Sequence, residues 1–317
     1  MRSLLARLAV LGALAVSMSA CGGGTGTSLP FAGGPNNGGG QSGTIQTGSN
    51  GQALLRFIQG SPDVATVANP NGAVDVCVDN LSLGVLGGTA QYGKPATGAT
   101  GTLASVPAGI GHTIAVYTSL GNGAGGFGAA GSECATAPGP YFGFSPLAVT
   151  TVVPPINGRV TIVLTGTKAT NTFGLYGFTE PSFVVAPGGN EIISHNAAPA
   201  FSSVGGGKVG FGTCSTTVTP CVTPVTLPGA GNLSPPKIGT VSAITTATSN
   251  TSPINVIPAG FYDGIGVPTG TVVPITSIVA PNAQSAQPYI IDLYAIDAPA
   301  GGLNLVAVPE QSLGFGF

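Results

Sequence analysis

The chain has 317 residues and a formal net charge of −2, and only 6% of its residues are charged. Ordinary globular domains carry about 25% charged residues, and the 53 glycines and 27 prolines here stand in place of residues that helices favour. This composition predicts an all-β fold of short strands and many turns, and its apolar fraction of 43% argues against wholesale disorder. The chain has no cluster of basic residues that could neutralise phosphates, so nucleic acid is not expected as a partner.

The first segment has the layout of an export signal. Arg2 and Arg7 stand before the apolar run 8–16, which is too short to span a bilayer as a mature helix. Residues 18–21, Met-Ser-Ala-Cys, resemble the bacterial lipoprotein cleavage box, in which a cysteine becomes the lipidated N-terminus. We therefore predict a lipoprotein signal peptide over 1–20 and lipidation of Cys21. The alternative is an ordinary signal peptide followed by an incidental cysteine.

The next stretch, residues 21–51, is predicted to be a Gly-rich tether behind the lipidated cysteine. It consists mostly of Gly, Ser, Thr, Asn and Gln and has no periodic apolar face. Random-coil scaling gives such a chain an r.m.s. reach of about 30 Å. Gly22 follows the cysteine where an aspartate would favour inner-membrane retention, so the resemblance to lipoproteins implies an outer-membrane location in the cell envelope, facing the periplasm or exposed at the surface.

A first β-sandwich domain is predicted over 52–187. Val74, Val76 and Val78 alternate with polar residues and should face a core, whereas Asp75 and Cys77 point the other way. Short strands separated by turns are typical of an antiparallel, immunoglobulin-like sandwich. The strands are expected over Leu54–Ile58, Ala73–Asp79, Thr102–Val106, His112–Thr118, Arg159–Thr165 and Phe173–Phe178.

The polar residues of this domain are interpreted as structural. Ser61, Pro62 and Asp63 are predicted to form a turn. Arg56 is expected to pair with Asp75 across neighbouring strands, and Asp79 is expected to cap a turn.

Four segments together resemble a known family: Arg56–Asp63, Ala73–Asp79, Tyr92-Gly93 and Val106–Gly109. In this combination the chain is similar to the bacterial extracytoplasmic family catalogued as domain of unknown function 4397, over about residues 54–176. The resemblance implies a sandwich-like exported domain, often lipid-anchored or in tandem. It implies no catalytic residues.

A second, diverged β-sandwich domain is predicted over 188–317. Pro107-Ala108-Gly109 recurs as Pro258-Ala259-Gly260, Gln59–Pro62 can be aligned with Asn196–Pro199, and the strand 160–164 can be aligned with 289–293. The residues 187–190, Pro-Gly-Gly-Asn, are the expected boundary. A single large irregular sandwich is the alternative.

Four cysteines remain after Cys21, and an even number in an exported protein favours disulfides. We predict a bond between Cys77 and Cys134 and another between Cys214 and Cys221. No C-x-x-C pair or neighbouring histidine favours a metal site, and no metal or other cofactor is predicted.

No catalytic set is predicted. Ser61, Asp63 and His112 contain the residue types of a hydrolase triad, but no nucleophile elbow frames the serine. The leading hypothesis is a non-catalytic structural or binding module of the cell envelope, held to the membrane by its lipid and binding an envelope protein or glycan. One alternative is a hydrolase of envelope glycans or esters, with paired carboxylates. Another is a glycan-binding adhesin, marked by exposed aromatic residues such as Tyr92, Tyr117 and Tyr141 on one face.

Overall fold

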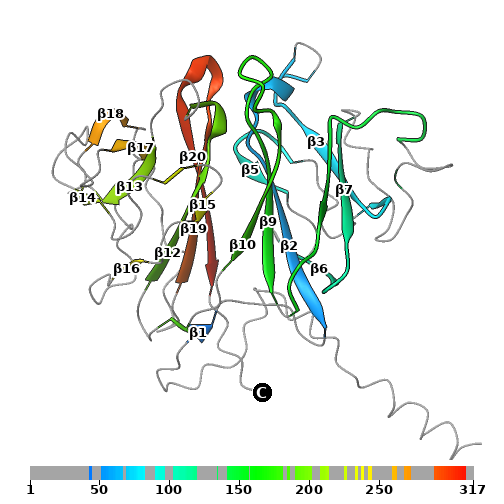
Figure 1. The fold of residues 1–317 in the computed structure, drawn as a ribbon, viewed down its shortest axis with the longest axis horizontal. Coiled ribbons are helices and arrows are strands. Elements are labelled where there is room, and N and C mark those ends of the chain that lie inside the picture. Colours follow the sequence, from blue (N-terminus) through cyan, green and yellow to red (C-terminus); the bar gives the residue numbers. More distant parts are fainter. Residues whose placement is uncertain are drawn as a thin grey trace, which may run out of the picture.

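The fold consists of β-strands, turns and short helical turns, which confirms the all-β class (Figure 1). The computed structural model describes residues 43–44, 51–66, 69–82, 90–96, 103–119, 134, 141–156, 158–180, 184–185, 190–201, 208–213, 225–226, 233–234, 237–238, 242–244, 259–262, 268–272 and 289–311. The predicted signal peptide, Cys21, Cys214 and Cys221 lie outside the described residues. Two strands, β1 (Gly43–Thr44) and β11 (Val184–Val185), form a small sheet of their own.

Two sheets are built from the first half of the chain. One has the order β10-β9-β2-β5, with β6 also paired to β2, and the other has the order β4-β3-β7-β8. We call them the first inner sheet and the first outer sheet. The inner strands are β2 (Gln52–Gln59), β5 (Lys94–Pro95), β6 (Ala104–Pro107), β9 (Arg159–Thr165) and β10 (Gly174–Glu180). The outer strands are β3 (Val74–Val78), β4 (Leu81–Ser82), β7 (His112–Thr118) and β8 (Ala148–Val152).

The two sheets enclose an apolar core, as the alternation along β3 predicts. Val74, Val76 and Val78 are buried in it together with residues of the inner sheet such as Phe57 and Ile162. The predicted strands of this half are all present, and the bounds of β7 and β9 are those expected from the sequence. The strands β4, β5 and β8 were not predicted.

The expectation of purely antiparallel sheets is wrong. β2 pairs with β9 in parallel, Leu54 opposite Arg159 and Gln59 opposite Leu164, while the other pairs of this sheet are antiparallel. A sequence pattern of period two reports which face a residue occupies but not the direction of the neighbouring strand.

The second half forms two further sheets, here called the second inner and second outer sheets. The inner one has the order β15-β12-β19-β20, with β16 also paired to β12, and the outer one has the order β14-β13-β17-β18. The inner strands are β12 (Asn190–Ala197), β15 (Lys237–Ile238), β16 (Ser242–Ile244), β19 (Tyr289–Asp297) and β20 (Leu303–Gln311). The outer strands are β13 (Val209–Thr213), β14 (Val225–Thr226), β17 (Ala259–Tyr262) and β18 (Pro268–Val272). The 3-10 helices are η1 (Pro62–Val64) and η2 (Pro299–Gly301).

The strand pairing of the second half repeats that of the first. β12 and β19 are parallel, as β2 and β9 are, and the antiparallel partners of β12 occupy the same two ends as those of β2. An isolated bridge joins Val209 to Leu233, and a corresponding bridge joins Val74 to Ala90.

One local contact is repeated as well. The side-chain carbonyl of Gln59 accepts a hydrogen bond from Ser61 N at 2.8 Å, and that of Asn196 accepts one from Ala198 N at 3.0 Å. This repeat supports the alignment of Gln59 with Asn196. The residues opposite these two are Leu164 and Ala295, so the alignment of 160–164 with 289–293 is two residues out of register.

The alignment of the two Pro-Ala-Gly segments is wrong. Pro107 ends β6 and Gly109 lies in the following turn, whereas Ala259 and Gly260 lie inside β17, which pairs as β7 does. Pro, Ala and Gly are abundant in this chain, so a shared tripeptide carries little positional information.

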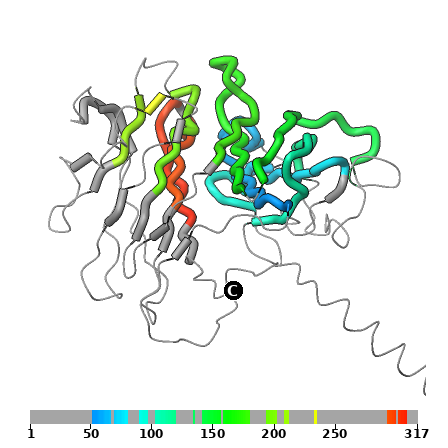
Figure 2. The backbone as a smooth tube through the Cα atoms, turned by 60° about the horizontal axis from the view of Figure 1, so that its bottom comes forward, coloured from blue at the N-terminus to red at the C-terminus, as the bar shows by residue number. Residues whose placement is uncertain are grey.

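The two inner sheets pack against each other at the centre of the molecule, in a contact we call the central interface. Figures 1 and 2 show β19 and β20, orange to red, beside the green strands β9 and β10 in two views. The interface is apolar in large part and is made by Ile58, Val163, Phe178, Ala197, Tyr294, Ile296, Val306 and Val308. The outer sheets lie on the far sides of this pair, so the two inner and two outer sheets form four layers.

Candidate functional site

Arg56 of β2 lies in the central interface. Its Nη1 is 2.7 Å from Asp292 Oδ2 of β19 and donates to Tyr294 OH at 3.1 Å. Arg159 Nη2 of β9 donates to the same oxygen of Asp292. Both arginines and the aspartate are fully buried. Two arginines of the first half therefore share one carboxylate of the second.

Tyr294 extends this ion network into the interface. Its hydroxyl donates to Thr161 Oγ1 at 3.0 Å, and its ring stacks on His195 with 4.1 Å between centroids. Phe178 meets both rings edge-on. His195 is fully buried, and its Nδ1 lies 3.1 Å from Leu293 O, so this histidine is a packing residue of the interface.

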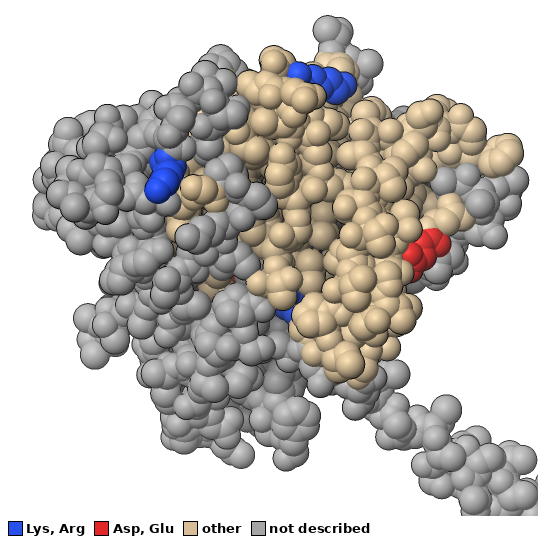
Figure 3. Space-filling model, viewed as in Figure 1, with Lys and Arg blue, Asp and Glu red and all other residues tan. Residues whose placement is uncertain are grey.

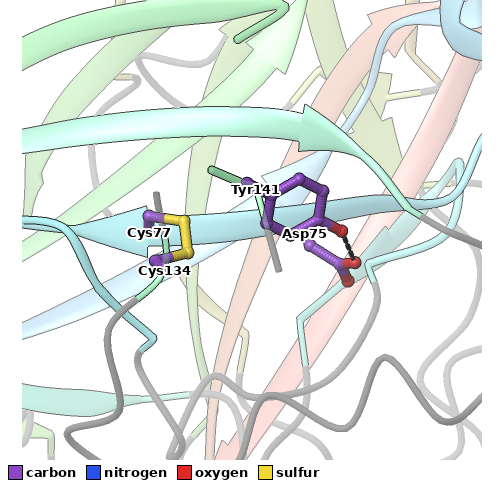
Figure 4. Close-up of a disulfide and its surroundings, with 4 residues drawn as sticks. All are labelled: Asp75, Cys77, Cys134 and Tyr141. Atoms are coloured by element: carbon purple, nitrogen blue, oxygen red, sulfur yellow. Dashed lines mark hydrogen bonds between the residues drawn. A yellow bond between two sulfur atoms is a disulfide. The ribbon is translucent and has the colours of Figure 1, made fainter. Parts of the chain in front are cut away.

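The expected pair between Arg56 and Asp75 is wrong, because β2 and β3 belong to different sheets. Asp75 is buried on the outward side of β3 and accepts a hydrogen bond from the hydroxyl of Tyr141 (Figure 4). The Tyr141 ring stacks on Tyr117 with 4.6 Å between centroids. The segment at 141 thus covers the outward side of β3.

The disulfide between Cys77 and Cys134 is confirmed, with the two Cα atoms 6.0 Å apart. It lies beside the contact between Asp75 and Tyr141 in Figure 4. Cys134 N also donates to Asn80 O at 2.7 Å, and Tyr141 N donates to Cys134 O at 2.9 Å. One covalent and several polar contacts therefore hold this covering segment on the outer sheet.

Ser61, Pro62 and Asp63 form the predicted turn as the start of η1. Ser61 caps this helix, accepting from Asp63 N at 3.3 Å, and its hydroxyl donates to Gly166 O at 2.8 Å. Asp63 accepts from Lys168 N. The motif consequently anchors the loop between β9 and β10.

His112 lies elsewhere, so the triad types are not brought together. Its Nδ1 is 2.6 Å from Asp79 Oδ2, and its Nε2 is 2.6 Å from Pro107 O. Asp79 also accepts from Thr113 N at 2.8 Å, and together with Asn80 it occupies the positive-φ hairpin turn between β3 and β4. Ser61 and Asp63 make their contacts with the β9–β10 loop instead. Asp79 lies in the predicted turn, but its carboxylate contacts His112 and Thr113 of β7 rather than capping the turn.

Asp297 joins the two halves at one end of the central interface. Its carboxylate accepts from Gly166 N at 3.1 Å, Ala200 N at 3.2 Å and Phe201 N at 2.7 Å. Burial raises the pKa of the Asp297 carboxyl, and the backbone hydrogen bonds partly oppose this. Tyr92 donates to Asp297 O at 2.7 Å, and burial raises its pKa to about 12.

The three tyrosines proposed as an adhesin face do not form one. Tyr117 and Tyr141 are buried on the first outer sheet, and Tyr92 packs at the central interface. The large exposed aromatic residues among those described are Phe142 and Phe144.

The polar residues described above contact backbone or side chains of the fold, so the contacts observed for them are structural. Among the described residues there is no group of His, Cys, Asp and Glu that could hold a metal ion, and no helix long and apolar enough to cross a bilayer.

The role of Arg159 and the partner of Arg56 were not predicted from the sequence. An arginine that begins a strand of β-branched residues, as Arg159 does in RVTIVLT, is unusual and could have drawn attention to it. No local signal indicates Asp292, which lies 236 positions from Arg56.

No family model and no curated protein match this chain. The chain has similarity to a solved structure, at 1.67 Å resolution, of a candidate cell adhesion protein from Bacteroides uniformis. The identity is 13%, the TM-score is 0.22, and the match covers 84% of this chain and 100% of the other. At this level the likeness carries no argument about function.

Proposed function

We propose that the chain is a non-catalytic lipoprotein of the cell envelope that acts as a structural or binding module. It comprises two tandem immunoglobulin-like β-sandwich domains, 52–187 and 188–317, carried on a Gly-rich tether from a lipidated Cys21. The repeated strand pairing of the two halves supports the tandem arrangement. The sequence at 1–21 supports export and lipidation.

The proposal of a non-catalytic role depends on one observation: the polar residues of the segments 56–63 and 73–79 make contacts within the fold. Arg56 binds Asp292 between the halves, Ser61 and Asp63 hold a hairpin loop, and Asp75 holds Tyr141. A catalytic serine or carboxylate must instead be open to a substrate. No observation on the described residues favours the hydrolase or the tyrosine-faced adhesin.

The anchoring is tested by cell fractionation of a Cys21→Ser variant. The variant should leave the membrane fraction, while Cys214→Ser, which removes another cysteine, should remain in it. Retention of Cys21→Ser in the membrane fraction would reject lipid anchoring.

The binding role is tested by proximity labelling around the protein in intact cells. We expect repeated labelling of an envelope protein, and protease added outside the cells reports the side of the outer membrane. Labelling confined to cytoplasmic proteins would reject the envelope location.

A further inference from the structure

An uncharged apolar tip lies where the folded part of the chain begins. Ile110 is in the loop between β6 and β7, and Val153 and Ile156 follow β8; their exposed fractions are 54%, 62% and 68%. The two loops touch, because Gly109 N donates to Pro154 O at 2.8 Å. We call these three side chains the apolar tip.

The tip is adjacent to the end of the tether. Ala108 N donates to Gly51 O at 2.8 Å, and Gly51 is the residue immediately before β2. The proposed lipid is attached to Cys21, and random-coil scaling of the tether predicted over 21–51 gives a reach of about 30 Å r.m.s. between that lipid and Gly51. Such a tether keeps the tip at a high effective concentration near the membrane surface.

Several backbone positions of the two loops that carry the apolar tip have no N–H that needs water as a partner. Prolines lack an N–H, and several of the remaining amides donate within the protein. Pro107 ends β6, and Pro154 and Pro155 lie in the loop after β8. The amides of Ala108, Gly109 and Gly158 donate to the carbonyl oxygens of Gly51, Pro154 and Pro155, respectively. At these six residues, moving the loops into the headgroup region leaves no backbone N–H unsatisfied, and an unsatisfied N–H is a main cost of placing irregular backbone there.

Charge does not oppose contact with a bilayer. Residues 107–111 and 153–158 contain no charged side chain, and Arg159, which follows, is fully buried. Among the described residues near the tip, Asp79 is a charged group, and its Oδ2 lies 2.6 Å from His112 Nδ1. Figure 3 shows the described surface on one face as uncharged apart from isolated spots. A tip of this kind gains from burial of aliphatic groups and has no basic residues to attract anionic lipid.

We propose that the apolar tip docks on the phospholipid surface that holds the lipid anchor, with Ile110, Val153 and Ile156 at the level of the headgroups and upper acyl chains. This inference rests on the proposed lipid anchoring for its biological setting. Its effect is to orient the molecule, with the Gly51 end of the first domain against the bilayer, where a tether alone would leave the orientation free.

The test uses the mature chain held on phosphatidylcholine vesicles. The natural chain has no tryptophan, so Ile156→Trp introduces a single emitting residue. Phe142→Trp is the matched control, because Phe142 is 63% exposed and precedes β8, whereas the tip residues Val153 and Ile156 follow it. An N-terminal hexahistidine tag and a nickel-chelating lipid replace the natural anchor, so the tip is tested whether or not the cell lipidates Cys21.

Brominated phosphatidylcholine should quench Ile156→Trp several-fold more strongly than Phe142→Trp. Val153→Asp should lower the quenching of an Ile110→Trp reporter, because it places a charge in the tip. Equal quenching of Ile156→Trp and Phe142→Trp would overturn the proposal. So would a dimer in solution that shields Ile156→Trp before vesicles are added, because the tip would then bind a second copy. Failure of Cys21→Ser to leave the membrane fraction would instead reject lipid anchoring and leave the quenching result standing.

Discussion

Arg56 and Asp292 are 236 positions apart in the sequence, yet Arg56 Nη1 lies 2.7 Å from Asp292 Oδ2 in the centre of the molecule. Both side chains are fully buried, and Arg159 donates to the same oxygen. Taking these charges out of water is costly, so the contact is stabilising only while all partners are present. We expect the ion network to make the packing of the two halves specific.

Removing the shared carboxylate should strongly destabilise the protein. Asp292→Ala leaves Arg56 and Arg159 buried without it, and we expect the free energy of unfolding to fall by about 3 to 5 kcal/mol. Urea unfolding followed by circular dichroism measures this change. Asp79→Ala is the control, because the side chain of Asp79 is 43% exposed. This substitution should lower the free energy of unfolding by about 1 kcal/mol or less. Similar losses in the two variants would contradict the buried role of Asp292.

The two halves should unfold in one transition. The central interface joins apolar residues of both inner sheets, and Asp297 of the second half accepts a backbone hydrogen bond from Gly166 of the first. Calorimetry of the natural chain should give a single peak whose calorimetric and van't Hoff enthalpies agree. Asp292→Ala should broaden or split that peak. Two well-separated peaks in the natural chain would show that the interface does not couple the halves.

Loss of the confirmed disulfide should destabilise the first outer sheet. Cys77 and Cys134 are separated by 57 positions, and the chain-entropy model gives about 4 kcal/mol for a loop of that length. A double variant, Cys77→Ala with Cys134→Ala, should have a lower midpoint of thermal unfolding, because its unfolded chain is no longer constrained by the disulfide. Tyr141→Phe, which removes only the hydroxyl bonded to Asp75, serves for comparison and should cost about 1 to 3 kcal/mol. A double variant as stable as the natural chain would argue against the predicted effect.

The second predicted disulfide is tested separately. Cys214 and Cys221 lie outside the described residues, so the pairing stays a prediction. Peptide mapping without reduction should recover one peptide pair containing Cys77 and Cys134 and another containing Cys214 and Cys221. Free thiols at the latter two positions would reject it.

Tyr92 should make the stability fall at alkaline pH. Its pKa is raised from 10.0 to about 12, first because burial disfavours the charged form. A group whose pKa is raised on folding contributes stability that is complete below the unfolded value and is lost as pH rises through the folded value. Relative to Tyr92→Phe, the natural chain should therefore lose stability between pH 10 and about 12. Parallel pH curves for the two proteins would contradict this assignment.

Most strands of the first half could be predicted from the local alternation of apolar and polar residues. Alternation along Val74–Val78 separates a core face from an outward face, and only a strand places successive side chains in that way. Burial was nevertheless underestimated, because Asp75 and Cys77 on the outward face are covered by the segment at 134 and 141. Local pattern contains no information about a covering segment so far away in the chain.

Local features of the sequence were enough to predict the all-β class, the turn at Ser61-Pro62-Asp63, the valines facing the core and the bond between Cys77 and Cys134. Each depends on period, turn chemistry or the small number of cysteines. Only the tertiary structure decided that β2 and β9 are parallel and that Arg56 binds Asp292. A strand has two faces and two edges. Which segment covers each of them is set by packing between parts of the chain that are far apart in the sequence, 105 positions for Leu54 and Arg159 and 236 for Arg56 and Asp292.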